Sequence, residues 1–192
     1  MVSGLLLFYV VLALGVSFLC SILESILLSI SHSHIQLMSK SGNKSGLIWT
    51  NLKENDSVRP LTAILTLNTI AHTVGAVGVG SVVQDEYGNE WVTLASAILT
   101  MAVLLLSEIL PKTLGTVYWK KLSPFAAHIT NVLTLALILI VVPIEWFRKL
   151  LPKGNKTTVT RDELAVLADI GEEEGTIEED EETVIQNLLR LA

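Results

Sequence analysis

Hydroxyl and carboxylate side chains interrupt the first long apolar run of this sequence. Ser17, Ser21, Ser25 and Ser29 recur at every fourth residue, and Glu24 lies beside them. Four-residue spacing places the serines on one face of a helix. Two interpretations stay open for this stripe. Small hydroxyl residues let helices pack closely and bond to their own backbone, whereas ionisable groups at membrane depth tend to mark an ion or substrate path.

An amide and an imidazole stand in the second apolar run. Asn68 and His72 are four residues apart, and Thr69 follows Asn68. Asn68 could hold two helices together or coordinate an ion, and this run alone does not decide between the roles. We expect His72 to make a packing hydrogen bond rather than bind metal, because no second His or Cys is placed to join it.

A carboxylate meets a helix breaker at the end of the third apolar run, in the segment Ser107-Glu-Ile-Leu-Pro-Lys112. Pro111 has no N–H, so a continuing helix would leave the Ser107 carbonyl without its usual partner. We expect a break that frees backbone oxygens beside Glu108, since half-helix ends at membrane depth can coordinate ions. The alternative is an ordinary helix end at the interface, where Lys112 extends its amine to water.

Together these groups form a set of hard oxygen ligands. Hydroxyls, an amide oxygen, carboxylates and freed carbonyls suit Mg²⁺ or Na⁺ better than Zn²⁺ or Cu⁺. The sequence contains one cysteine, Cys20, and neither a nucleophile paired with a base nor a glycine-rich phosphate loop is evident. We therefore predict a cation site and not an enzyme.

Long apolar stretches must position these residues. Four of them are long enough to cross about 30 Å of hydrocarbon, and they cover residues 5–30, 61–83, 91–110 and 122–147. Cytoplasmic loops collect Lys and Arg, and the link between the first two stretches is basic whereas the next link is acidic. We expect three crossings with the amino terminus outside and the carboxyl terminus in the cytoplasm.

The fourth stretch has basic residues on both sides, with Pro143 and Pro152 near its end. A full crossing would put one basic cluster outside, so we expect a re-entrant or interfacial segment instead. The connector over residues 31–59 mixes apolar residues with lysines and predicts amphipathic juxtamembrane helices. The predicted fold is therefore an all-α integral membrane protein with three transmembrane helices and a fourth, non-crossing apolar segment.

Charge divides the chain into two parts. The net charge of -6 combines +1 over residues 1–150, from 9 basic and 8 acidic residues, with -7 over residues 151–192, from 4 basic and 11 acidic residues. We expect a transmembrane domain over residues 1–152 and an acidic cytoplasmic helical linker over 153–192. Thr160 and Glu163 predict a capping box, and Gly175 ends that helix. The linker is either a solvated face or a coupling element whose acids hold Mg²⁺ weakly. No basic face suggests nucleic acid as a partner.

Four segments in order resemble motifs of the CorC/CNNM (cyclin M, hemolysin C-like) family. Phe18–Ile26 resembles its F-x-S-x-x-E-[TS]-A pattern, Leu67–Thr73 its G-N-x-x-x-N-[TI] run, and Glu108–Lys112 its E-I-x-P-K motif. Residues 160–164 and 173–181 are similar to the T-R-x-E-L and E-E-G-x-I-x-x-x-E segments that lead into a pair of CBS domains. The resemblance covers the whole chain, although Leu67 replaces the usual Gly and His72 stands where a second Asn is common.

The resemblance implies a homodimeric transporter in the cell membrane that exports Mg²⁺ coupled to Na⁺ entry. It carries the role of metal ligand over to four positions: Ser21, Ser25, Asn68 and Glu108. Further candidates near these ligands are Glu24, Thr69, His72, Ser107, Pro111, Lys112 and Gly115. The CBS pair expected after Ala192 is absent, so nucleotide regulation should be absent too. A membrane Mg²⁺ sensor or scaffold that does not transport is the alternative function.

Overall fold

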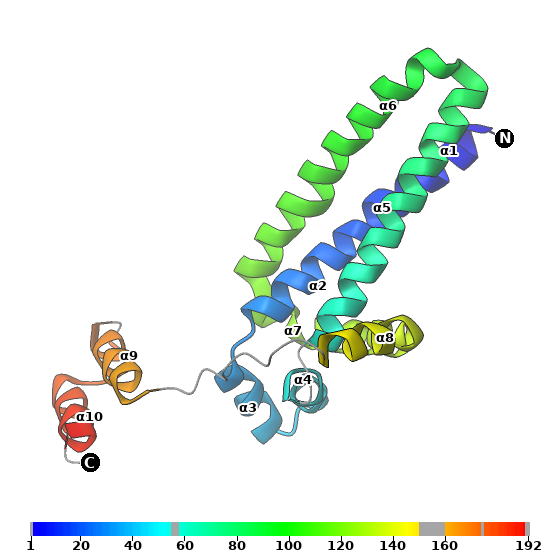
Figure 1. Ribbon diagram of the computed structural model, residues 1–192. Helices are drawn as coiled ribbons and strands as arrows, with labels where there is room; N and C mark the ends of the chain where they lie inside the picture. Colours follow the sequence, from blue (N-terminus) through cyan, green and yellow to red (C-terminus); the bar gives the residue numbers. More distant parts are fainter. Residues whose placement is uncertain (1, 55–57, 150–159, 174, 191–192) are drawn as a thin grey trace. The chain divides into compact units, whose positions relative to one another are not determined.

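The computed structural model describes residues 2–54, 58–149, 160–173 and 175–190. The chain divides into two compact units, Met1–Leu150 and Leu151–Ala192, and each is described by itself. Every element in the described ranges is a helix (Figure 1). This confirms the prediction of an all-α fold.

Three helices of the first unit are long and apolar enough to cross a bilayer: Gly4–Ser29, Val58–Tyr87 and Asn89–Ala136. The first comprises α1 (Val2–Val11), the π-helical turn η1 (Leu12–Val16) and α2 (Ser17–Ser29), and the second is α5 (Val58–Tyr87). The third comprises α6 (Asn89–Ala102), the π-helical turn η2 (Val103–Ile109) and α7 (Leu110–Ala136). Gly88 joins α5 to α6 with a φ of 91°, a conformation that glycine adopts without strain. The three predicted crossings are confirmed as helices long and apolar enough to span a membrane.

The fourth apolar stretch does not form a span of its own among the described residues. It begins within α7, beyond a kink at Tyr118 (φ -103°, ψ 16°), and continues into α8 (Ile138–Lys149) after Leu137. The 12 residues of α8 are about 18 Å long, less than the hydrocarbon thickness. Its contacts are with α5 and α7, so it packs back onto the helices of its own unit.

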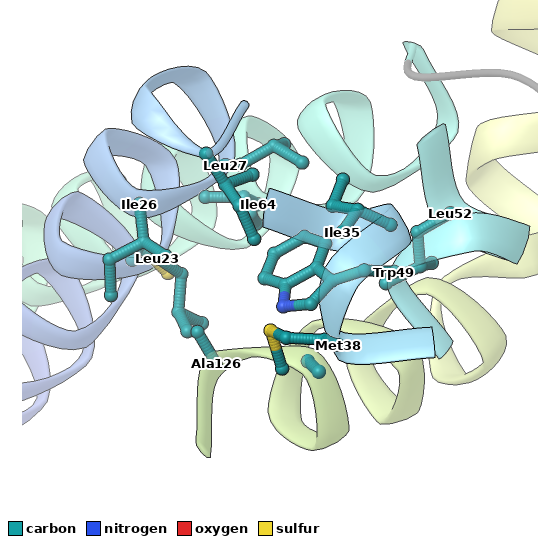
Figure 2. Packing of buried hydrophobic residues seen from close by; sticks show 12 residues of the cluster. Leu23, Ile26, Leu27, Ile35, Met38, Trp49, Leu52, Ile64 and Ala126 are labelled. Atoms are coloured by element: carbon teal, nitrogen blue, oxygen red, sulfur yellow. The ribbon is translucent and has the colours of Figure 1, made fainter. Parts of the chain in front are cut away.

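Two short juxtamembrane helices, α3 (His32–Lys40) and α4 (Lys44–Glu54), form a hairpin that packs on the ends of the long helices. Figure 2 shows the shared core, in which Trp49 of α4 lies among side chains from α2, α3, α5 and α7. Trp49 is fully buried, and its Nε1 donates a hydrogen bond to the Ser123 carbonyl at 2.9 Å. Lys53 Nζ donates to the Ile30 carbonyl at 2.6 Å, at the end of α2. The hairpin thereby contacts the two helices, α2 and α7, that carry the candidate serines and Gly115.

The second unit is a pair of helices, α9 (Arg161–Glu173) and α10 (Glu179–Arg190). The Thr160 N–H donates to the Glu163 carboxylate at 2.8 Å, and the Glu163 N–H donates to the Thr160 hydroxyl at 3.2 Å. These reciprocal bonds are the predicted capping box. Gly175 adopts a φ of 69° between the helices, where a side chain would be strained.

Candidate cation site

The first span and α5 pack as antiparallel helices, and two contacts show which of their residues lie opposite each other. Gly75 of α5 lies against η1, because a Cβ added there would come within 2.5 Å of the Ala13 Cβ. About one turn further along each helix, His72 Nε2 lies 2.5 Å from Ser17 Oγ. Because the two helices run in opposite directions, residue numbers rise along one helix and fall along the other. The two residue numbers of each contacting pair therefore add up to nearly the same value. The tight contact at glycine lets the two backbones approach closely.

The next turn of the same register places Ser21 opposite Asn68. Both residues are four positions from the bonded pair, Ser21 after Ser17 and Asn68 before His72. Ser21 Oγ and Asn68 Oδ1 are buried, and neither has a hydrogen-bond partner in the described part of the chain. Buried polar atoms are nearly always hydrogen-bonded, so two orphaned oxygens on facing helices call for a partner that the described residues do not supply.

Glu108 comes from a π-helical turn on the third span. It lies in η2, whose wide turns displace backbone carbonyls from the usual bonding pattern. The neighbouring Ser107 is fully buried, and its hydroxyl donates to the Leu14 carbonyl of η1 at 2.9 Å. The Glu108 side chain is half-buried and has no hydrogen bond or ion pair with the described residues. The two π-helical turns are therefore in contact, and one of them presents an unpaired carboxylate.

Pro111 does not break the third helix, which corrects the expectation from sequence. The chain continues as α7 through Pro111, and the kink lies instead at Tyr118. The Leu110 N–H bonds to the Leu105 carbonyl, five residues back, so the helix widens before the proline rather than ending. The π-helical turn thus accommodates the missing N–H of proline while the helix stays continuous.

Ser25 is held against α7 at a position where only glycine fits. A Cβ added to Gly115 would lie 1.8 Å from the Ser25 Oγ and 3.0 Å from the Ile22 carbonyl. The Ser25 hydroxyl donates to that same carbonyl at 2.9 Å, so its oxygen lone pairs remain available as acceptors. Gly115 therefore acts as a packing position, and it lets the serine stripe reach the third span.

An ion pair between Lys112 and Glu24 joins α7 to α2. Lys112 Nζ lies 3.2 Å from Glu24 Oε2, with 47% of the lysine side chain and 18% of the glutamate side chain exposed. The pair links α2 to α7 one turn beyond Ser21 and Glu108. From the sequence, Lys112 is either a further candidate near the ligands or a side chain that extends to water. Its partner could not be predicted, because the partner of a side chain depends on the rotation of the two helices.

Of the further candidates, two have partners that explain them without an ion. His72 is hydrogen-bonded to Ser17, and exposed Thr69 donates to the Leu65 carbonyl of its own helix at 2.9 Å. Within the described residues no group of three or more His, Cys, Asp or Glu side chains could hold a metal. The arrangement that remains combines hydroxyl, amide and carboxylate oxygens on α2, α5 and η2, and α2 contacts both of the other elements.

Fold and site together define a multi-span α-helical membrane protein with a polar cluster inside its helix bundle. The chain belongs to the cyclin M (CNNM) family, because the model of the cyclin M transmembrane N-terminal domain matches residues 8–181. The family suggested by the sequence motifs is thereby confirmed.

Curated relatives come from bacteria and plants. UPF0053 protein sll1254 of Synechocystis is 31% identical over 185 residues, which cover 96% of this chain and 52% of that protein. A UPF0053 protein of Haemophilus influenzae is 30% identical over 132 residues, covering 68% of this chain and 30% of its own length. The chloroplastic DUF21 domain-containing protein At1g55930 of Arabidopsis thaliana is 26% identical over 198 residues, which cover 93% of this chain and 28% of that protein. The chain thus spans about half or less of the length of these relatives.

Proposed function

We propose that this chain moves Mg²⁺ across the bilayer through an intramembrane site formed by Ser21, Ser25, Asn68 and Glu108. The observation that carries the proposal is the pair of orphaned oxygens, Ser21 Oγ and Asn68 Oδ1, on facing turns of α2 and α5. Leaving such groups buried and unsatisfied costs about 1–3 kcal/mol each. A bound cation would offset that cost and would explain why the polar atoms are there.

The ligand chemistry favours a hard divalent cation. Mg²⁺ prefers about six oxygens in an octahedral array and keeps several of its waters. One carboxylate from Glu108, an amide oxygen and two serine hydroxyls would supply four oxygens, and water or carbonyls displaced in η2 would complete the shell. A single carboxylate with neutral oxygens also limits how tightly the ion is held, as turnover requires.

Family membership and the basic loops extend the proposal. We infer Na⁺-coupled export by a homodimer in the cell membrane, with the amino terminus outside and the carboxyl terminus in the cytoplasm. The positive-inside pattern supports this orientation. In this arrangement α9 and α10 form the cytoplasmic lead-in to a CBS-domain pair.

Mg²⁺ flux in proteoliposomes containing the 192-residue chain tests the proposal. An inward Na⁺ gradient should drive release of Mg²⁺, and Asn68→Ala or Glu108→Gln should abolish that release without lowering the melting temperature. Thr69→Ala and Glu86→Gln are matched controls, because both side chains are exposed on α5. Normal flux in the Asn68 and Glu108 variants would refute the site. Saturable Mg²⁺ binding without flux in the unmodified protein would favour the sensor alternative.

A further inference from the structure

Lys112 occupies a position between two carboxylates of the candidate site. Its ammonium contacts Glu24 across the helix interface at 3.2 Å. It lies four residues after Glu108 in the same continuous helix, which places the two side chains about one turn apart. The long side chain of Lys112 can therefore reach either acid.

The ion pair has little value as a structural bond. Nearly half of the Lys112 side chain is exposed, and exposed ion pairs contribute about 0–1 kcal/mol. Its effect on nearby charge is larger than its effect on stability, because a unit charge within several ångströms repels an arriving divalent cation even at the intermediate dielectric near a protein surface. Ser21 and Ser25 lie within one helical turn of Glu24 on α2, so the residue that the ammonium contacts is a sequence neighbour of the candidate ligands.

We propose that Lys112 is a tethered counter-ion that sets the affinity of the cation site, with Glu24 holding it away from Glu108. This inference rests on the proposed function. Lys112 lowers the net negative charge that an arriving cation meets, so the ion binds more weakly and leaves faster. Glu24 contributes by keeping the ammonium off Glu108, which then remains free for the transported ion.

Opposite effects are expected from removing each partner. Lys112→Met keeps the length of the side chain but removes the charge, so Mg²⁺ should bind roughly ten-fold tighter while the maximal rate of flux falls. Glu24→Gln releases the ammonium to pair with Glu108, so Mg²⁺ should bind more weakly. The double variant Glu24→Gln/Lys112→Met should bind Mg²⁺ more tightly than Glu24→Gln alone, because no ammonium remains to compete for Glu108.

Mg²⁺ titration calorimetry on the purified chain, together with flux in proteoliposomes and melting temperature, tests this pattern. Lys121→Met is the matched control, because Lys121 is an exposed lysine further along α7. Tighter binding with slower maximal flux in Lys112→Met, and weaker binding in Glu24→Gln, would support the inference. Unchanged affinity in both variants, or weaker binding in both with a shared loss of stability, would overturn it and leave the proposed function standing. Absence of Mg²⁺ binding in the unmodified protein would overturn both.

Discussion

The hydroxyl oxygen of Ser17 and Nε2 of His72 lie 2.5 Å apart, in a direct hydrogen bond between α2 and α5. One turn further along each helix, the same register presents Ser21 and Asn68, whose buried oxygens have no partner in the described chain. Two successive turns of one helix pair therefore differ. The described residues satisfy the polar groups of the first turn, whereas they leave the buried oxygens of the second turn without a partner.

The turn that pairs Ser17 with His72 should contribute to the stability of the fold. Ser17→Ala leaves the His72 ring nitrogen without its partner, so the free energy of unfolding should fall by about 0.5–2 kcal/mol. A double-mutant cycle with His72→Ala, followed by thermal unfolding in nanodiscs, measures the interaction directly. We expect the two losses to be less than additive. Strict additivity would show that the bond contributes nothing.

The second turn should contribute to ion binding instead. Ser21→Ala removes a buried hydroxyl that has no partner among the described residues, so the free energy of unfolding should stay the same or rise by up to about 1 kcal/mol. Mg²⁺ affinity and flux should nevertheless fall, because the proposed site would lose one of its oxygen ligands. Calorimetric titration and unfolding of Ser17→Ala and Ser21→Ala side by side compare identical substitutions one turn apart. Equal loss of stability in both variants would contradict the distinction.

Hydropathy and motif order were sufficient to predict much of this molecule. Three spans, the family and the capping box of Thr160 and Glu163 follow from local patterns, because a helix in lipid must satisfy its backbone internally. The register between α2 and α5 could not be predicted, since it depends on the close contact of Gly75 with Ala13. Sequence alone thus supplied the candidate oxygens but not which of them face one another.

The π-helical turns also lay beyond sequence reasoning. Pro111 predicted a broken helix, yet the chain absorbs the missing N–H by widening one turn earlier, where Ser107 bonds to the Leu14 carbonyl. That bond joins residues 93 positions apart, so no local pattern reveals it. The Glu24–Lys112 pair escaped prediction for the same reason, because it depends on how α2 and α7 are rotated against each other.

Gly115 should tolerate no side chain. A Cβ there would lie 1.8 Å from Ser25 Oγ and 3.0 Å from the backbone of Ile22, so Gly115→Ala should destabilise the chain by about 1–3 kcal/mol and reduce Mg²⁺ flux. Gly80→Ala is the control, because a Cβ at Gly80 meets no atom within 4 Å. It should raise stability slightly, since alanine favours a helix over glycine. A harmless Gly115→Ala would mean that α2 and α7 are less closely packed.

Acid should stabilise the α9–α10 pair. A hydrogen bond to Asp169, followed by burial and neighbouring acids, raises the pKa of Glu182 above its usual 4.5. A raised pKa means that the folded state favours the protonated acid. The contribution of Glu182 to the free energy of unfolding is therefore full below the usual pKa and is lost as pH rises through the raised pKa. Glu182→Gln should remove this pH dependence.

Hydrogen exchange of the α9 and α10 amides in the whole chain, corrected for intrinsic rates, measures the effect as the pH rises from about 4, near the usual pKa of a glutamate. Glu173→Gln, at the exposed end of α9, should retain the pH dependence of the unmodified chain. Protection that grows with pH in the unmodified chain would contradict the assignment.

Lys53 should stabilise the end of α2 through its bond to the Ile30 carbonyl, 2.6 Å away. Lys53→Met keeps the apolar stem but loses the donor, so the free energy of unfolding at neutral pH should fall by about 1–2 kcal/mol.

Burial lowers the pKa of Lys53 from 10.5, so the folded state binds fewer protons and stability should rise with pH between the lowered value and 10.5. Chemical unfolding from neutral pH to pH 10.5 should show that rise in the unmodified chain but not in Lys53→Met. Lys44→Met, at an exposed position of α4, should retain both the stability and the rise, and a matching loss there would show that the effect of Lys53 is not due to its bond with α2.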